Sequence, residues 1–312
     1  MPVQALPYIS LLGFFFGSTL IASRFSVGQY APTTYIGLRM VIASLCHVAV
    51  YAVLRRRPWP RDRRLWRHAM VLGVFGTAIP MTFIVSSLQY QSSGVTSLLI
   101  TTQPAITVLL AHFFLTDERL TRRTTIGIGL ALSGAVMLAL RGETGLPDMT
   151  AASPIGYLMV LFAMLMGSGS TIYARLYMTD LDAFDVGSIR MWTAALVVMP
   201  LSALTIGVDL SAVTAAGYVA LVYAALIGTF AGMLLAFYNV KRFGATASAL
   251  TSYVIPIVAG VGGVLVLGET FTPVMGVGMA IIIAGIAILN QRDRPRLSTE
   301  STSAPESSIA RR

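Results

Sequence analysis

Ten apolar stretches, each long enough to cross a bilayer, constrain the fold of this chain more than any other feature of its sequence. A transmembrane helix needs about 20 apolar residues to span the hydrocarbon layer. The predicted spans, numbered 1 to 10 in chain order, are residues 6–27, 32–54, 68–89, 93–115, 124–141, 154–177, 183–206, 214–238, 245–267 and 273–290. We therefore predict an all-α polytopic membrane protein with ten transmembrane helices.

The composition agrees with a membrane protein and excludes an ordinary soluble domain. Only 11% of the residues are charged and 55% are hydrophobic, whereas a soluble domain carries about 25% charged residues. The single cysteine, Cys46, lies in an apolar stretch, which excludes a disulfide framework or a Cys-rich metal site. No Lys or Arg precedes the first apolar stretch, so we expect a retained first span rather than a cleaved signal peptide.

The positive residues predict the orientation in the membrane. The loop between spans 2 and 3 holds seven arginines, namely Arg55, Arg56, Arg57, Arg61, Arg63, Arg64 and Arg67. Because Lys and Arg gather on the cytoplasmic side, we place this loop and both termini in the cytoplasm of a bacterium, with the spans in its inner membrane. The same side then receives 18 of the 22 basic residues. The net charge of +9 is therefore explained by topology and not by nucleic-acid binding.

The two halves of the chain align when one is shifted by 151 residues. The matched pairs are Arg24 with Arg175, Arg39 with Arg190, Glu118 with Glu269, and Thr121 with Thr272. Pro104 and Pro256 differ by 152, so the alignment of the two halves contains a one-residue gap. Each half holds five spans, so the second must enter the membrane inverted. We predict one repeat at 1–146, an inverted repeat at 147–290, and a polar, disordered tail at 291–312.

Inverted repeats are typical of secondary transporters, which bind substrate at the repeat interface near the membrane midplane. The five-plus-five layout, the arginine of GLRM in span 2 and the turns DERLT and GETFT resemble the EamA-type branch of the drug/metabolite transporter superfamily. In length and span count the chain is most similar to bacterial amino-acid exporters of that branch, including YddG-type exporters of aromatic amino acids. The resemblance implies an outer wall of spans 5 and 10, and a cavity formed largely by spans 1, 3, 4, 6, 8 and 9.

Two prolines, Pro104 in span 4 and Pro256 in span 9, indicate a central polar site. A proline lacks an amide hydrogen, so each frees the carbonyl four residues earlier, at Ile100 and Ser252. A freed carbonyl is tolerated at membrane depth where it lines a wet cavity. The predicted substrate-binding residues around the prolines are Thr101, Thr102, Gln103, Pro104, Thr251, Ser252, Tyr253 and Pro256. The alternative is that these prolines only bend their helices.

Other polar residues are candidates for the same cavity or for gates. Thr82, Ser170, Tyr173 and Tyr223 are expected to line the cavity. For Ser170 and Tyr173 the alternative is small-residue helix packing. Arg39 and Arg190 lie inside spans 2 and 7, where they either support the architecture or bind a substrate carboxylate. Glu118 and Glu269 precede Thr121 and Thr272, which are suited to cap helices. Each glutamate then belongs to a capped turn or to a gating ion pair.

The acidic residues indicate how transport is driven. None of the 13 lies at the middle of a span, where proton pumps usually hold a carboxylate, and no P-loop signature is present. We therefore expect facilitated diffusion or exchange of a small neutral or zwitterionic solute, most simply amino-acid export. The alternatives are a proton-coupled exporter of drugs or other metabolites, a passive channel and an intramembrane enzyme. We expect no enzymatic activity, cofactor or metal, and as partners only the substrate, membrane lipid and at most a second copy in a homodimer.

Overall fold

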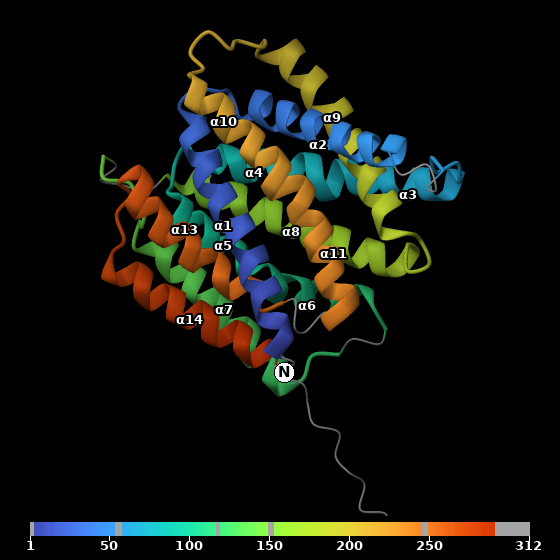
Figure 1. Cartoon of the computed structure of the whole chain (residues 1–312). Helices are drawn as coiled ribbons and strands as arrows, with labels where there is room; N and C mark the ends of the chain where they lie inside the picture. Colours follow the sequence, from blue (N-terminus) through green and yellow to red (C-terminus); the bar gives the residue numbers. More distant parts are fainter. Residues whose placement is uncertain (1–2, 54–57, 117–118, 149–152, 245–248, 291–312) are drawn as a thin grey trace, which may run out of the picture.

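The chain is a bundle of long helices (Figure 1). The computed structural model describes residues 3–53, 58–116, 119–148, 153–244 and 249–290. Every regular element within these ranges is a helix. Nine of the described helical segments are long and apolar enough to cross a membrane, and Thr251–Leu267 is a shorter apolar helix. The prediction of an all-α membrane protein with ten helices is thus confirmed.

Seven spans are single helices, and three are composite. The single helices are α1 (Leu6–Val27), α2 (Pro32–Val53), α7 (Arg122–Leu140), α8 (Pro154–Tyr177), α9 (Ala183–Thr205), α13 (Thr251–Leu267) and α14 (Pro273–Asn290). The composite spans are α3 (Arg63–Gly73), η2 (Val74–Ala78) and α4 (Ile79–Ser87); α5 (Ser93–Ile100) and α6 (Gln103–Phe114); and α10 (Ala215–Tyr223), η3 (Ala224–Ala231) and α11 (Gly232–Phe243). A short 3₁₀ turn, η1 (Val3–Ala5), precedes α1.

Span 9 was predicted from 245, but α13 begins at Thr251, and residues 245–248 lie outside the described residues. Two further span boundaries differ from those predicted from hydropathy. Span 3 begins at Arg63 rather than 68, because the side chain of Asp62 caps the helix by accepting a hydrogen bond from the Arg64 amide at 2.8 Å. Span 8 continues to Phe243 rather than 238. The residue after it, Gly244, has a φ of +86°, which favours glycine and ends the helix. In both cases a charged helical turn extends beyond the apolar stretch.

The two prolines act differently, although the sequence predicted a kink at each. Span 4 is divided, with a turn at Thr101–Thr102 between α5 and α6, and Pro104 lies in the first turn of α6. Pro256 lies within α13, which continues through it. The π-helical segments η2 and η3 were not predicted. They occupy the middle of spans 3 and 8, which correspond to each other in the predicted repeats, and π-helical turns often occur at functional sites.

The contacts between spans occur in pairs that the repeat predicts. Span 1 packs against span 9 as span 4 packs against span 6, and span 3 packs against span 6 as span 8 packs against span 1. Three further contacts, between spans 2 and 7, 4 and 9, and 5 and 10, each join a span to its equivalent in the other repeat. The division into two inverted repeats remains a prediction, and these paired contacts agree with it.

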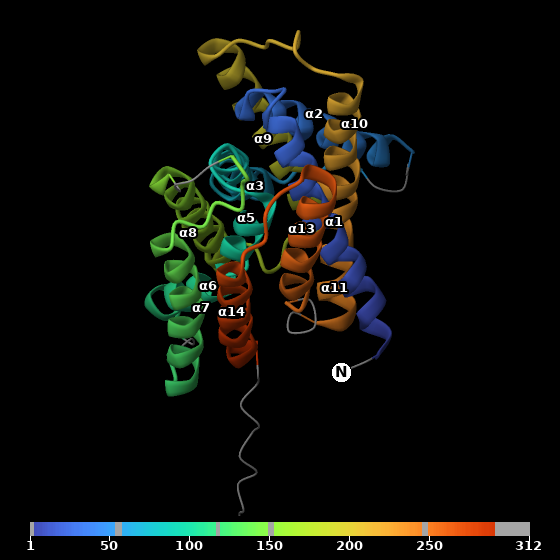
Figure 2. The same ribbon diagram turned by 90° about the vertical axis from the view of Figure 1, so that its left-hand side faces the viewer.

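Helices α7 and α14 lie against each other along one edge of the bundle, as both views show (Figures 1 and 2). Glycines bring the two backbones close. A Cβ atom on Gly285 would lie 2.4 Å from the amide nitrogen of Ala131, and one on Gly134 would lie 3.1 Å from the carbonyl oxygen of Gly278. Small residues of spans 5 and 10 thus serve packing within one chain, which is the wall that the family resemblance implies.

Candidate functional site

The break in span 4 faces the proline of span 9. Thr101, in the turn between α5 and α6, donates a hydrogen bond to the Ser97 carbonyl at 2.8 Å, and its hydroxyl also lies 3.3 Å from the Ser252 carbonyl oxygen. That carbonyl lacks its usual helical partner because Pro256 has no amide hydrogen. The predicted neighbourhoods of the two prolines are therefore in direct contact.

Two polar side chains in this central region have hydrogen-bonding capacity that the described residues do not use. The Gln103 side chain is half-buried and makes no hydrogen bond within the described ranges. A Cβ atom on Gly167 of α8 would lie 2.8 Å from its Nε2 atom, so this glycine provides space for the amide. The hydroxyl of Thr251 is buried and has no partner there either. A buried polar group without a partner is costly, so each of these two groups is a candidate for contact with a bound ligand.

Three other predicted residues form hydrogen bonds within the protein itself. Thr102 donates to the Leu99 carbonyl at 2.7 Å. The hydroxyl of Tyr253 accepts a hydrogen bond from the Asn290 amide at 3.1 Å. Ser170 of α8 donates to the Met166 carbonyl of its own helix at 2.7 Å. These three side chains shape the region more than they offer free donors or acceptors.

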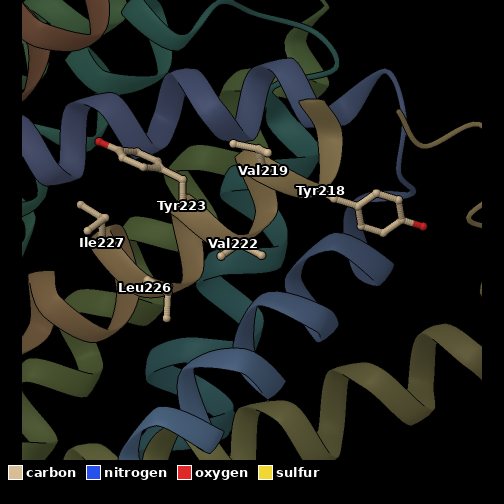
Figure 3. A pocket seen from close by; sticks show the side chains of 6 residues that line it. All are labelled: Tyr218, Val219, Val222, Tyr223, Leu226 and Ile227. Atoms are coloured by element: carbon tan, nitrogen blue, oxygen red, sulfur yellow. The ribbon is translucent and has the colours of Figure 1, made fainter. Parts of the chain in front are cut away.

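The structure places two predicted cavity residues, Tyr173 and Tyr223, in other contacts. The hydroxyl of Tyr173 bonds to Nδ1 of His68 at 2.7 Å. Tyr223 lines an apolar groove of about 450 Å³ along α10 and η3, where its ring points toward α1 (Figure 3) and its hydroxyl lies 2.8 Å from the Ser18 hydroxyl. Thr82 is half-buried on α4. Neither contact joins a tyrosine to the meeting point of Thr101 and Ser252.

Arg39, which is buried, and Arg190, which is half-buried, each bind the π-helical segment of the other half of the chain. Arg39 is 4% exposed, and its Nε donates to the Thr229 hydroxyl in η3 at 2.7 Å. Arg190 donates from Nε to the Thr77 hydroxyl and from Nη2 to the Gly76 carbonyl, both in η2. Neither arginine contacts a carboxylate among the described residues. The geometry therefore favours the architectural role over binding of a substrate carboxylate.

Glu269 joins spans 9 and 4 at the end of the bundle opposite the N-terminus, which we call the distal end (Figure 1). The distal end carries the connections at 28–31, 88–92, 141–148, 206–214 and 268–272. The carboxylate is 5% exposed. It accepts hydrogen bonds from the Ser93 amide at 2.8 Å, the Ser93 hydroxyl at 2.7 Å and the Gly94 amide at 3.5 Å. A carboxylate at a helix N-terminus is also stabilised by the helix dipole. We call Glu269, Ser93 and Gly94 the distal closure.

The predicted alternatives for Glu269, a capped turn or an ion pair, are both present. Thr272 caps α14 by accepting from the Met275 amide at 3.1 Å, and Pro273 is the first residue of the helix. The Nε atom of Arg24 lies 4.0 Å from Glu269, which is the limit of an ion pair. In the other half, Thr121 caps α7 as predicted, while Glu118 lies outside the described residues.

The sequence reasoning missed Ser93, Thr77 and Thr229 as partners of the charged residues. For the two threonines a signal was present, because they differ by 152, the same offset that relates the two prolines. Ser93 offered no such signal. It is one of two adjacent serines at the start of span 4, and only the fold shows that its amide and hydroxyl meet Glu269.

An exposed ion pair joins the first turn of α3 to the connection between α8 and α9. Arg64 Nη1 lies 2.8 Å from Asp180 Oδ2. A hydrogen bond from its own backbone amide and the bond from Arg64 lower the pKa of Asp180. Within the described part of the chain, no group of three or more His, Cys, Asp or Glu side chains lies close enough to hold a metal ion.

A comparison with protein families identifies what this architecture belongs to. The sequence pattern of the EamA-like transporter family matches the chain twice, at residues 4–140 and 154–291. The chain belongs to the EamA-like transporter family. This EamA protein is therefore a multi-pass membrane transporter, and the resemblance noted from the sequence is confirmed.

Similar proteins include other transporters. A probable terminal-alkyne amino-acid exporter of Streptantibioticus cattleyicolor is 28% identical over 287 residues, covering 91% of this chain and 93% of the relative. The uncharacterized inner membrane transporter YedA of Escherichia coli is 23% identical over 275 residues, covering 88% and 86%. A protein of known crystal structure has a TM-score of 0.61 at 20% identity, covering 90% of this chain and 94% of that chain, which shows that the two chains share a fold.

Proposed function

We propose that this EamA transporter moves small neutral or zwitterionic amino acids by facilitated diffusion or exchange, most often in the direction of export. The observation that carries the proposal is the contact between the broken span 4 and the proline of span 9, where Gln103 and Thr251 have unused hydrogen-bonding groups. Neutral amide and hydroxyl groups suit a solute without net charge. The exporter from Streptantibioticus cattleyicolor supports amino acids as the substrate class.

The packing of the helices supports alternating access with the distal end closed. Helix α5 packs against α13 next to the distal closure. Toward the other end, α6 packs against α7 and α8, whereas α11 packs against η3 and α1. Figure 2 shows α6 and α11 on opposite sides of the bundle. We propose that this state gives access from the cytoplasm, with both termini on that side, and that separating Ser93 from Glu269 exposes the central region to the distal side.

Uptake into liposomes that hold the purified protein tests the proposed function. We expect saturable uptake of radiolabelled threonine or phenylalanine without an imposed pH gradient, because none of the 13 acidic residues lies at the middle of a predicted span. Preloading the vesicles with unlabelled substrate should accelerate uptake, as exchange requires, whereas a passive channel would give flux that does not saturate. Absence of uptake for both amino acids would refute the proposed substrate class.

One observation favours a second candidate, a proton-coupled exporter. Glu269 is a buried carboxylate that holds spans 4 and 9 together, so its protonation would weaken the distal closure. In the same liposomes, this candidate predicts uptake that depends strictly on a pH gradient and that loses this dependence in Glu269→Gln. Uptake that is equal with and without the gradient would exclude it.

A further inference from the structure

A second cavity lies at the distal end and is separate from the central region. It has a volume of about 350 Å³ and is lined by residues from four segments of the chain. They are Arg24, Phe25 and Gly28 at the end of α1; Gln89 before α5; Leu146, Pro147 and Asp148 between α7 and α8; and Leu267 and Glu269 at the end of α13. Ligand sites usually have volumes of about 300–1,000 Å³, so this pocket suits a small metabolite.

The cationic group of the pocket has unused donors. The Nε atom of Arg24 is buried and makes no hydrogen bond within the described residues. Glu269 is 4.0 Å away, which is too far for a hydrogen bond, and its oxygens already accept from Ser93 and Gly94. A guanidinium with unsatisfied donors is well suited to bind a ligand carboxylate, since paired hydrogen bonds between these two groups are strong.

The anionic group of the pocket is equally available. Asp148 lines the same cavity from the connection after α7, is exposed, and makes no hydrogen bond among the residues that the structure describes. A carboxylate attracts an ammonium group. Beside Glu269, the pocket thus carries a guanidinium whose Nε makes no hydrogen bond and a carboxylate, Asp148, without a hydrogen-bond partner among the described residues, with Phe25 and Leu146 as apolar surface beside them.

We infer that this pocket is a second binding site for the substrate, a distal waiting site that recognises the zwitterionic backbone of an α-amino acid. Arg24 binds the carboxylate, Asp148 binds the ammonium group, and the side chain lies on the apolar wall. The inference rests on the proposed amino-acid substrate and adds a site to it. Because the pocket borders Glu269, an amino acid bound there lies next to the contact that must open for transport.

Protection of a single thiol from labelling tests this site without measuring transport. In a Cys46→Ser background, Gln89→Cys places the one thiol at the rim of the pocket. We expect millimolar L-phenylalanine to slow its reaction with a membrane-impermeant thiol reagent. The amide of phenylalanine lacks the carboxylate and N-acetylphenylalanine lacks the ammonium group, so each should protect about tenfold less well.

Variants of the charged residues complete the test. Asp148→Asn and Arg24→Gln should abolish protection. Asp209→Asn is the matched control, because Asp209 lies in the distal connection between α9 and α10 and its carboxylate accepts from the nearby Ser211 amide at 2.9 Å. This control should retain protection, and so should Gln103→Ala, which changes only the central region.

The outcomes separate this inference from the proposed function. Absence of protection by phenylalanine, or equal protection by the amide and the N-acetyl compound, overturns the distal waiting site. If amino acids are still taken up, the proposed function stands without it. Protection that requires Arg24 and Asp148, in a protein that takes up no amino acid, supports the site and refutes the proposed function.

Discussion

Replacing Glu269 by alanine is expected to abolish most uptake and to lower the free energy of unfolding by about 3 kcal/mol. The substitution leaves the buried Ser93 amide without its acceptor, leaves the Ser93 hydroxyl only the Ala259 carbonyl at 3.2 Å, and removes the counterion near Arg24. The conformation that is closed at the distal end then loses its main polar contact between spans 4 and 9, and the transporter can no longer alternate between its two states. Thermal unfolding in detergent and liposome uptake measure the two effects.

Two further variants separate the hydrogen bonds of the closure from its charge and its space. Glu269→Gln keeps an acceptor for the Ser93 amide and should cost less than Glu269→Ala. Gly263→Ala leaves the carboxylate in place, but its Cβ atom would lie 2.1 Å from Oε2 of Glu269, so the closure cannot form unchanged. Gly129→Ala is the control, because Gly129 has no neighbour within 4 Å of the added atom. Wild-type stability and uptake in Glu269→Ala would contradict the closure.

Replacing Arg39 by alanine is expected to lower the free energy of unfolding by about 3 kcal/mol, because it leaves a cavity and removes the donor to the Thr229 hydroxyl. Lysine should not restore stability, since it cannot reproduce the contacts of the guanidinium with Thr229 and Ser23. Arg190→Ala should behave similarly, because it removes the matching contact with Thr77. Thermal unfolding in detergent provides the measurement.

Arg242→Ala is the control for the arginine variants. Arg242 is exposed near the end of α11, and exposed substitutions usually change stability by less than about 0.5 kcal/mol. If Arg39→Ala is as stable as Arg242→Ala, the contact between Arg39 and η3 contributes nothing to the fold. The arginine would then be free for a role with substrate.

Much of the fold could be predicted from the sequence, since the physics of the bilayer acts through composition and length. A stretch of apolar residues is sufficient to place a span, which is why span 10 was predicted at its observed bounds, 273–290. The same reasoning misplaced the start of span 3, because the charged turn at Arg63 is stabilised by the Asp62 cap and not by hydropathy. It also gave no indication of η2 and η3, since π-helical turns have no hydropathy pattern.

The candidate site was predictable only in part. Proline removes an amide hydrogen wherever it lies, so the freed Ser252 carbonyl could be predicted, and the structure shows the Thr101 hydroxyl beside it. The roles of Tyr173 and Tyr223 could not be predicted, because a tyrosine hydroxyl bonds to whichever polar group the fold brings near. For Tyr173 that group is His68, and for Tyr223 it is Ser18.

The most direct test of the central claim is the concentration dependence of amino-acid uptake by Gln103→Ala in liposomes. If substrate binds where α5 and α6 meet α13, removing the free amide should raise the KM about tenfold while thermal stability stays unchanged. Thr205→Val is the control, because this exposed hydroxyl only donates to the Leu201 carbonyl of its own helix. A wild-type KM in Gln103→Ala would contradict the proposed site, and a raised KM with an unchanged control would support it.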